Sequence, residues 1–190
     1  DVAAQHKDGR TALMMASHNG RVEVVRALLA AGAERIVAVE RDRRCIAALA
    51  DLANAQPGRL RVIAGDALKI DIDHALSGPM KVVANLPYNI ATALLLQWLA
   101  DPQRWLSLTL MFQKEVAHRI TAQPANKSYG RLSVLVQWLC ETQRFFDISP
   151  SAFVPPPRVT STLVGLKPRA QPLAPANRAS LERVLTVAFG

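Results

Sequence analysis

The sequence contains little cysteine and no long apolar run. Its 190 residues include two cysteines, Cys45 and Cys140, which stand far apart and match no metal-binding or redox spacing. We therefore expect two reduced thiols, no metal site and no disulfide scaffold. No apolar run approaches the roughly 20 residues of a membrane span, and the N-terminus does not resemble a secretory signal peptide. These absences predict a soluble protein of the cytoplasm.

The chain does have an excess of positive charge and an ordinary share of apolar residues. It carries 23 Lys and Arg against 15 Asp and Glu, a formal net charge of +8, and 50% of its residues are hydrophobic. This composition is typical of a folded protein, and the length suits one α/β domain. Because basic surfaces attract phosphate backbones irrespective of base sequence, the charge favours a polyanionic partner.

Residues 1–33 have a different pattern from the rest of the chain. A helical pattern breaks at Asn19-Gly20 and resumes over residues 22–31, and Gly32 stands where a helix C-cap is expected. Two short helices joined by Asn-Gly, with Gly-x-Thr-Ala-Leu in front, resemble one ankyrin repeat. Because a single repeat cannot bury its own apolar face, this segment must pack on something else or remain loose. A protein partner is one candidate for that role.

From residue 34 the pattern changes to alternating strands and helices. The predicted strands are residues 35–39, 60–64, 81–84, 106–112, 145–148 and 160–166. The predicted helices are the segment from about 42 to 54, 90–100, 114–121, 131–139 and 177–189. This alternation predicts a Rossmann-like, doubly wound α/β sheet over residues 34–168. A linker and the start of a helical segment follow over residues 169–190.

Polar residues stand where three of the predicted strands end. Glu40 follows the first strand, Asp66 with Ala67 follows the second, and Asn85 follows the third. In open α/β sheets ligands bind at the carboxyl ends of the strands, so these residues are candidates for one ligand site. Glu40 could accept hydrogen bonds from both hydroxyls of a ribose, and Asp66 from the exocyclic amine of an adenine. For either acid alone, a solvated loop residue or a helix N-cap is the alternative.

The most specific motif is Asn85-Leu86-Pro87-Tyr88. The exocyclic N6 of adenine is a poor nucleophile because its lone pair is delocalised into the ring. Two acceptors can receive hydrogen bonds from the two N–H groups of N6: the side-chain oxygen of Asn85 and a backbone carbonyl fixed by the following proline. Held in this way, the nitrogen aims its lone pair at a methyl sulfonium. Such positioning supplies ~7–11 kcal/mol at best. Tyr88 offers a face on which the base can stack, worth roughly 1–3 kcal/mol.

Four motifs together resemble one known family. They are NLPYNIAT at residues 85–92, LMFQKEVAHRI at 110–120, YGRLSVLVQ at 129–137 and SAFVPPPRV at 151–159. With them, residues 28–190 resemble the bacterial small-subunit ribosomal RNA adenine N6-dimethyltransferases. The resemblance implies S-adenosyl-L-methionine as the methyl donor, with Glu40 on its ribose and Asn85 near its methyl group. Asp66 and Ala67 would lie at its adenine.

The resemblance also implies how RNA is held. The partner would be small-subunit ribosomal RNA or a pre-30S particle. Phe153 would stack on a flipped target adenine opposite Tyr88, since chemistry on a paired base requires that base to leave the stack. Five basic residues would contact phosphates: Lys114, Arg119, Lys127, Arg131 and Arg158.

The chain departs from the family where a glycine-rich loop should hold the methionine part of the cofactor. Counted back from the first predicted strand without gaps, one loop glycine falls at His18, a later one at Gly20, and a family acidic residue at Ala16. His18 brings a side chain where the backbone must approach the ligand closely. Residues 12–16 either form a substitute first strand or stay helical, which leaves the sheet without its central strand. The local pattern predicts the helix.

The sequence therefore predicts N6-dimethylation of adenosines in 16S ribosomal RNA, impaired if the glycine loop is lost. Two alternatives stay open. One is another RNA or DNA adenine N6-methyltransferase, against which Leu86 and residues 153–157 argue by resemblance. The other is an ankyrin-type protein-binding module on a catalytically inactive Rossmann-like scaffold, which the altered loop supports.

Overall fold

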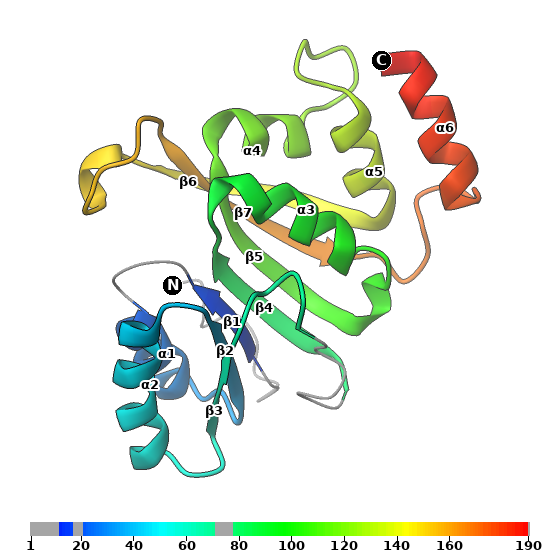
Figure 1. The fold of residues 1–190 in the computed structure, drawn as a ribbon. Coiled ribbons are helices and arrows are strands. Elements are labelled where there is room, and N and C mark those ends of the chain that lie inside the picture. Colours follow the sequence, from blue (N-terminus) through cyan, green and yellow to red (C-terminus); the bar gives the residue numbers. More distant parts are fainter. Residues whose placement is uncertain (1–11, 17–20, 71–77, 190) are drawn as a thin grey trace.

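The computed structural model describes residues 12–16, 21–70 and 78–189, which form a mixed sheet covered by helices (Figure 1). The described strands pair in the order β3-β2-β1-β4-β5-β7-β6. They are β1 Ala12–Ala16, β2 Ile36–Glu40, β3 Leu60–Ala64, β4 Met80–Asn85, β5 Trp105–Gln113, β6 Cys140–Ile148 and β7 Ser161–Pro168. Neighbours from β3 to β5 are parallel, whereas β7 is antiparallel to both β5 and β6. The sheet belongs to the predicted α/β class.

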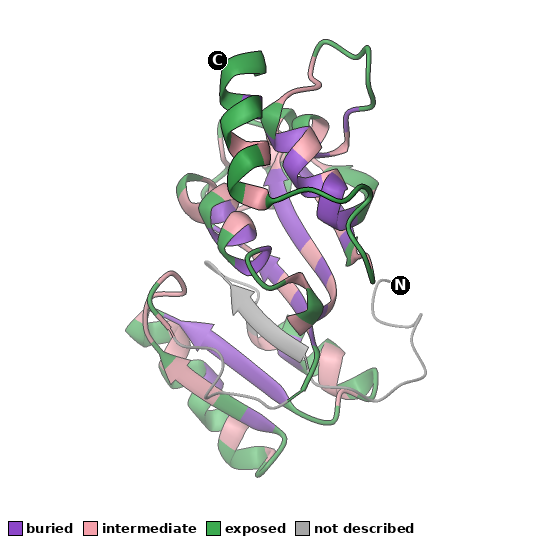
Figure 2. Cartoon of the chain, turned by 90° about the vertical axis from the view of Figure 1, so that its right-hand side faces the viewer, coloured by how far each residue is buried: buried purple, intermediate pink, exposed green. Residues whose placement is uncertain are grey.

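Helices cover both faces of this sheet. The first pair, α1 Arg21–Ala30 and α2 Arg43–Ala55, packs on one face, while α3 Tyr88–Trp98, α4 Lys114–Thr121 and α5 Arg131–Leu139 cover the other (Figure 1). Two short 3-10 turns, η1 Pro102–Arg104 and η2 Pro150–Ala152, precede β5 and follow β6. The last helix, α6 Arg178–Phe189, packs beside α5 and is mostly exposed (Figure 2). Within the described ranges, no helix is long and apolar enough to cross a membrane.

Strand β2 shows why the sheet needs both helical layers. Every residue of this strand is buried. Ile36 and Ala38 join the core cluster beneath α1 and α2, and Val37 and Val39 join the larger cluster on the opposite face. Successive side chains of a strand point to opposite faces, so a continuous apolar run is what a strand buried on both sides requires. The predicted buried strand is confirmed.

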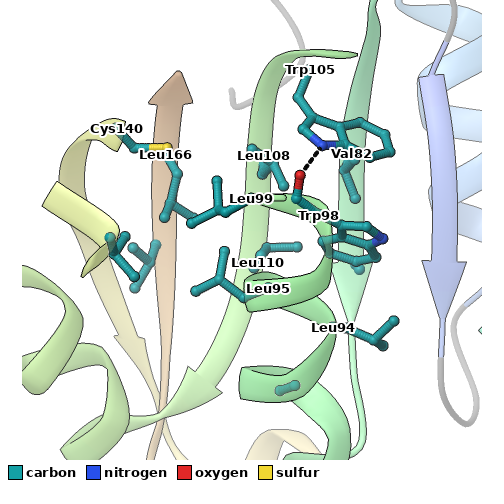
Figure 3. Close-up of a cluster of buried hydrophobic side chains, with 14 of the residues drawn as sticks. Val82, Leu94, Leu95, Trp98, Leu99, Trp105, Leu108, Leu110, Cys140 and Leu166 are labelled. Carbon is teal, nitrogen blue, oxygen red and sulfur yellow. Dashed lines mark hydrogen bonds between the residues drawn. The ribbon is translucent and has the colours of Figure 1, made fainter. Parts of the chain in front are cut away.

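The larger cluster is centred on α3 and β5 (Figure 3). The indole nitrogen of Trp105 donates a hydrogen bond of 2.7 Å to the carbonyl of Trp98, which closes the C-terminal end of α3 onto the sheet. Leu95 faces the same space and is 0% exposed. Cys140 also lies in this cluster, and burial raises the pKa of its thiol to about 12. Both Cys140 and Cys45 are free thiols, as expected.

The helix predicted for residues 12–16 is wrong, because these residues form β1. This strand lies inside the sheet and pairs in parallel with β2 on one side and β4 on the other. Without it, β2 and β4 would each present unpaired backbone groups to the protein interior, which costs more than a few residues gain from local helix preference. The second predicted helix is confirmed as α1, so β1 and α1 belong to the sheet and its cover.

The remaining elements follow the sequence pattern closely. The predicted helix at residues 131–139 coincides with α5, and that at 114–121 coincides with α4. The helix predicted from residue 90 begins two residues earlier, at Tyr88. The strand predicted at 145–148 is the end of the longer strand β6.

Candidate active site

The carboxyl ends of β2, β1 and β4 bring Glu40 and Asn85 into one row. Asn85 pairs with Ala16 of β1. One residue earlier, Met15 pairs with Val39 of β2, so Glu40 lies beside that same alanine. Because neighbouring strands lie about 4.8 Å apart, β1 separates the two functional positions by about 10 Å of backbone. The strand order changes direction at β1, and α/β sheets bind their ligands at such switch points.

Glu40 is buried at the end of β2. The residue is 5% exposed, and its Oε1 atom accepts hydrogen bonds from the amides of Arg41 and Asp42 at 2.7 and 2.6 Å. The N-cap of α2 is Asp42, whose Oδ1 atom accepts from the amide of Arg44 at 2.9 Å. Neither alternative for Glu40, a solvated loop residue or an N-cap, agrees with these contacts. The carboxylate is held in a fixed position beside the switch point.

Asp66 and Ala67 follow β3 and are half-buried. The Oδ1 atom of Asp66 accepts a hydrogen bond from the amide of Leu68 at 3.0 Å, so this side chain stabilises a local turn. The amide of Gly65 donates to the carbonyl of Glu40 at 2.8 Å and ties the end of β3 to the end of β2. Ala67 packs against the larger core cluster. The two acidic residues thus stand on adjacent strand ends.

The Asn85-Leu86-Pro87-Tyr88 motif forms the turn from β4 into α3. Leu86 is 3% exposed and anchors the turn in the core, whereas Asn85 is half-buried and Pro87 is exposed. Pro87 is the N-cap of α3, and its carbonyl accepts a hydrogen bond from the amide of Ala91 at 3.1 Å. The buried leucine side chain and the proline ring together fix the direction of the Leu86 carbonyl.

A hydrogen bond from a distant strand holds Tyr88. Its hydroxyl lies 2.6 Å from Oγ of Ser161, which begins β7 and is 0% exposed. Tyr88 itself is half-buried, so part of the ring faces outward. Ser161 was not predicted from the sequence, because nothing in the run Thr160-Ser161-Thr162 indicates which hydroxyl contacts Tyr88. Its role depends on the pairing of Ser161 with Gln113 of β5, which brings β7 beside the motif.

Phe153 lies in the loop between β6 and β7. It follows η2, and its amide donates a hydrogen bond of 3.1 Å to the carbonyl of Pro150. The side chain is half-buried. Among the residues that the structure describes, the ring-to-ring contacts involve neither Phe153 nor Tyr88, so the two rings do not stack on each other.

Comparison with known proteins identifies the family. A family model described as Ribosomal RNA adenine dimethylase matches residues 24–189. The chain belongs to this family. Ribosomal RNA small subunit methyltransferase A of Rhodospirillum rubrum is 54% identical over 167 residues, and that of Xanthobacter autotrophicus is 56% identical over 171 residues. Each match covers 88% of this chain but 58% and 59% of those relatives, so the chain spans less than two thirds of their length.

Two solved structures share the fold of this ribosomal RNA adenine dimethylase chain. A dimethyladenosine transferase from Plasmodium falciparum superposes with a TM-score of 0.84 at 26% identity, covering 99% of this chain and 66% of that one. The 23S rRNA methyltransferase ErmE superposes with a TM-score of 0.76 at 25% identity, covering 97% and 71%. Both agree with the Rossmann-like methyltransferase sheet predicted from the sequence.

A second family model, Ankyrin repeat, matches residues 8–39 of the chain. The match confirms the sequence similarity, but it contains β1, α1 and all of β2 except Glu40. Ankyrin-like sequence therefore supplies the first strand and first helix of the dimethylase sheet. His18 and Gly20, on which the expected loop glycines fall, lie outside the described residues. Ala16 ends β1 opposite Asn85 and brings no carboxylate to the row.

The five basic residues assigned to phosphate contacts are all exposed. Lys114 begins α4, and its Nζ atom lies 2.6 Å from Oδ2 of Asp147. Arg119 lies in the last turn of the same helix, and Arg131 begins α5. Lys127 and Arg158 lie in loops. Their exposure is compatible with phosphate contacts, which stay a prediction.

Proposed function

We propose that this chain transfers methyl groups from S-adenosyl-L-methionine to N6 of adenosines in small-subunit ribosomal RNA, twice per adenosine. The observation that carries the proposal is the Asn85-Leu86-Pro87-Tyr88 turn, aligned across β1 with the buried Glu40. Membership of the dimethylase family supports adenine in ribosomal RNA as the target, and the relatives at 54% and 56% identity support the small subunit. With small-subunit RNA as the proposed substrate, we expect the activity in the cytoplasm.

The residues at the strand ends fit S-adenosyl-L-methionine, which when bound supplies a methyl group from its sulfonium centre. An ionised carboxylate only accepts hydrogen bonds, so the buried Glu40 suits the two hydroxyls of a ribose. Asp66 suits the exocyclic amine of the cofactor's adenine, beside the small side chain of Ala67. A carboxylate has about four acceptor positions, so the bond from the Leu68 amide leaves capacity for that amine.

The turn after β4 suits the target amine. The Asn85 side-chain oxygen and the Leu86 carbonyl accept hydrogen bonds from the two N–H groups of N6. These hydrogen bonds draw the nitrogen toward tetrahedral geometry. Tyr88 and Phe153 hold the base between them by stacking. The methylated nitrogen is acidic and loses its proton to solvent, so no strong general base is required. This positioning acts only on a base that has left its helical stack.

Calorimetric titration with S-adenosyl-L-methionine tests the proposal. We expect the wild-type chain to bind the cofactor and Glu40→Gln to bind it roughly ten- to a hundredfold more weakly, because hydrogen bonds to a charged group are lost. Glu23→Gln is the matched control, since Glu23 is an exposed carboxylate of α1. Absence of any heat or thermal shift with millimolar cofactor would leave the inactive scaffold as the better account.

A further inference from the structure

A recess of about 320 Å³ lies between α4 and β6. We call it the α4–β6 recess. It is lined by Lys114, His118, Arg144, Phe145, Phe146 and Asp147. In Figure 1, β6 leads from this region into the loop that carries η2. Two aromatic side chains and several cationic ones thus line a single surface feature.

The two phenylalanines of the recess are exposed on an edge strand. Phe145 is 40% and Phe146 is 53% exposed, and β6 is the last strand in the order of the sheet. The pairing register shifts between Arg144 and Asp147, so these two residues lie in an irregularity of the strand. Such irregularities re-aim side chains and occur often beside active sites. Large apolar residues on an edge strand favour aggregation, and contiguous exposed ones usually mark a binding surface.

A glycine on the neighbouring strand makes room for one of these rings. A Cβ atom at Gly165 of β7 would lie 2.7 Å from Cζ of Phe145, so the ring lies directly over the glycine backbone. The tip of the Phe145 ring is therefore packed against Gly165. Phe146, the more exposed of the two, is left as the ring best able to stack on a ligand.

The charged groups around the rings are held in place by one another. Nη1 of Arg144 lies 2.6 Å from Nε2 of His118, and since a guanidinium only donates, the imidazole nitrogen accepts. Nζ of Lys114 lies 2.6 Å from Oδ2 of Asp147. The hydrogen bond from Lys114 lowers the pKa of the Asp147 carboxyl, followed in effect by the bond from Thr162. The recess thus presents an arginine hydrogen-bonded to His118 and a lysine paired with Asp147.

Hydrogen bonds connect the recess to the target-base side of the site. Oδ1 of Asp147 accepts from the Thr162 hydroxyl at 2.7 Å. The preceding residue, Ser161, holds the hydroxyl of Tyr88 at 2.6 Å. Two consecutive residues of β7 therefore contact the recess and Tyr88, respectively. We expect a polymer whose target base stacks on Tyr88 to extend along β7 toward Phe146 and Arg144.

We propose that the α4–β6 recess binds an unpaired nucleotide next to the target adenosine, with Phe146 stacking on its base and Arg144 contacting its phosphate. The inference rests on the proposed function in taking RNA as the substrate. Aromatic faces with nearby guanidinium groups recognise single-stranded RNA, because only an unstacked base exposes its face. A duplex would offer phosphates but no base to Phe146. The net charge of +8 complements that ligand.

Fluorescence anisotropy with a labelled single-stranded 12-nucleotide oligoadenylate tests this inference. We expect Phe146→Ala to weaken binding roughly five- to a hundredfold through lost stacking. Arg144→Ala should weaken binding and reduce the slope of log affinity against log salt by about one. The matched controls are Phe189→Ala and Arg183→Ala, both exposed on α6, which should bind like wild type. Thermal unfolding checks that every variant is folded.

The outcomes separate this inference from the proposed function. If Phe146→Ala and Arg144→Ala both bind the oligonucleotide with wild-type affinity, the recess does not bind a nucleotide, whatever the cofactor titration gives. That result would favour a protein as the partner of this surface. An equal loss of oligonucleotide affinity in the α6 controls, or no binding of the oligonucleotide by the wild-type chain, also overturns the proposed role of the recess. A chain that binds no S-adenosyl-L-methionine but loses RNA affinity on changing Phe146 contradicts the methyl-transfer proposal and supports the recess.

Discussion

At the scale of single residues, the proposed chemistry depends on acceptors held in fixed directions. Leu86 is buried and Pro87 caps α3, so the carbonyl between them cannot turn away from the site. Asn85 is the last residue of a strand paired on both sides, to β1 and to β5. Fixed acceptors matter because they aim the lone pair of N6, and such positioning supplies ~7–11 kcal/mol at best.

Replacing Asn85 by alanine should therefore stop methyl transfer without unfolding the chain. We expect the rate to fall by about a hundredfold or more, the usual effect of removing a preorganised polar group from a reacting centre. Cofactor affinity and thermal stability should change little. Asn89→Ala is the matched control, since Asn89 is an exposed asparagine, the second residue of α3. Wild-type turnover by Asn85→Ala would remove the role assigned to this side chain.

The bond between Tyr88 and Ser161 should appear as a coupling free energy. Tyr88→Phe and Ser161→Ala each remove the same 2.6 Å contact, and each should lower the free energy of unfolding by about 1 kcal/mol. The double variant should be little worse than either single one, as measured by urea unfolding. A pair that does not touch, Tyr129→Phe with Ser161→Ala, should be additive. Additivity in the Tyr88–Ser161 pair as well would mean that the contact does not stabilise the fold.

At the scale of elements, periodicity predicted α4, α5 and β2, because the apolar side chains of each face a core that their spacing specifies. It failed at β1, whose ankyrin-like sequence has a local helical pattern. The conformation of residues 12–16 is determined by the backbone hydrogen bonds that β2 and β4 require, and both of these strands lie further along the chain. The same limit hid Ser161 and the α4–β6 recess, since each depends on strand pairing. The positions of Glu40, Asp66 and Asn85 were predictable because each stands at the end of a predicted strand or within two residues of it.

Hydrogen exchange gives a direct test of β1. The amides of β1 should exchange as slowly as those of β4, because both strands have hydrogen-bonded neighbours on each side. The exposed segment at residues 171–177 provides the fast reference. Rapid exchange throughout β1 would mean that the sheet is open between β2 and β4 in solution.

At the scale of the whole molecule, the chain combines a basic composition with polar residues at the ends of β2 and β4, on either side of β1 at the switch point. Family membership over residues 24–189 and the fold of the two solved relatives agree on a ribosomal RNA adenine dimethylase. The chain spans 58% of the length of the Rhodospirillum relative. The residues to which we assign the chemistry, Glu40, Asn85 and Tyr88, all belong to the described sheet and α3.

Mass spectrometry of nucleosides tests the central claim most directly. The chain is incubated with S-adenosyl-L-methionine and pre-30S particles that carry unmethylated ribosomal RNA, and the RNA is then digested. We predict N6,N6-dimethyladenosine in the wild-type reaction and none with Asn85→Ala. A folded wild-type chain that leaves every adenosine unmethylated, or Asn85→Ala that methylates as well as wild type, would contradict the account.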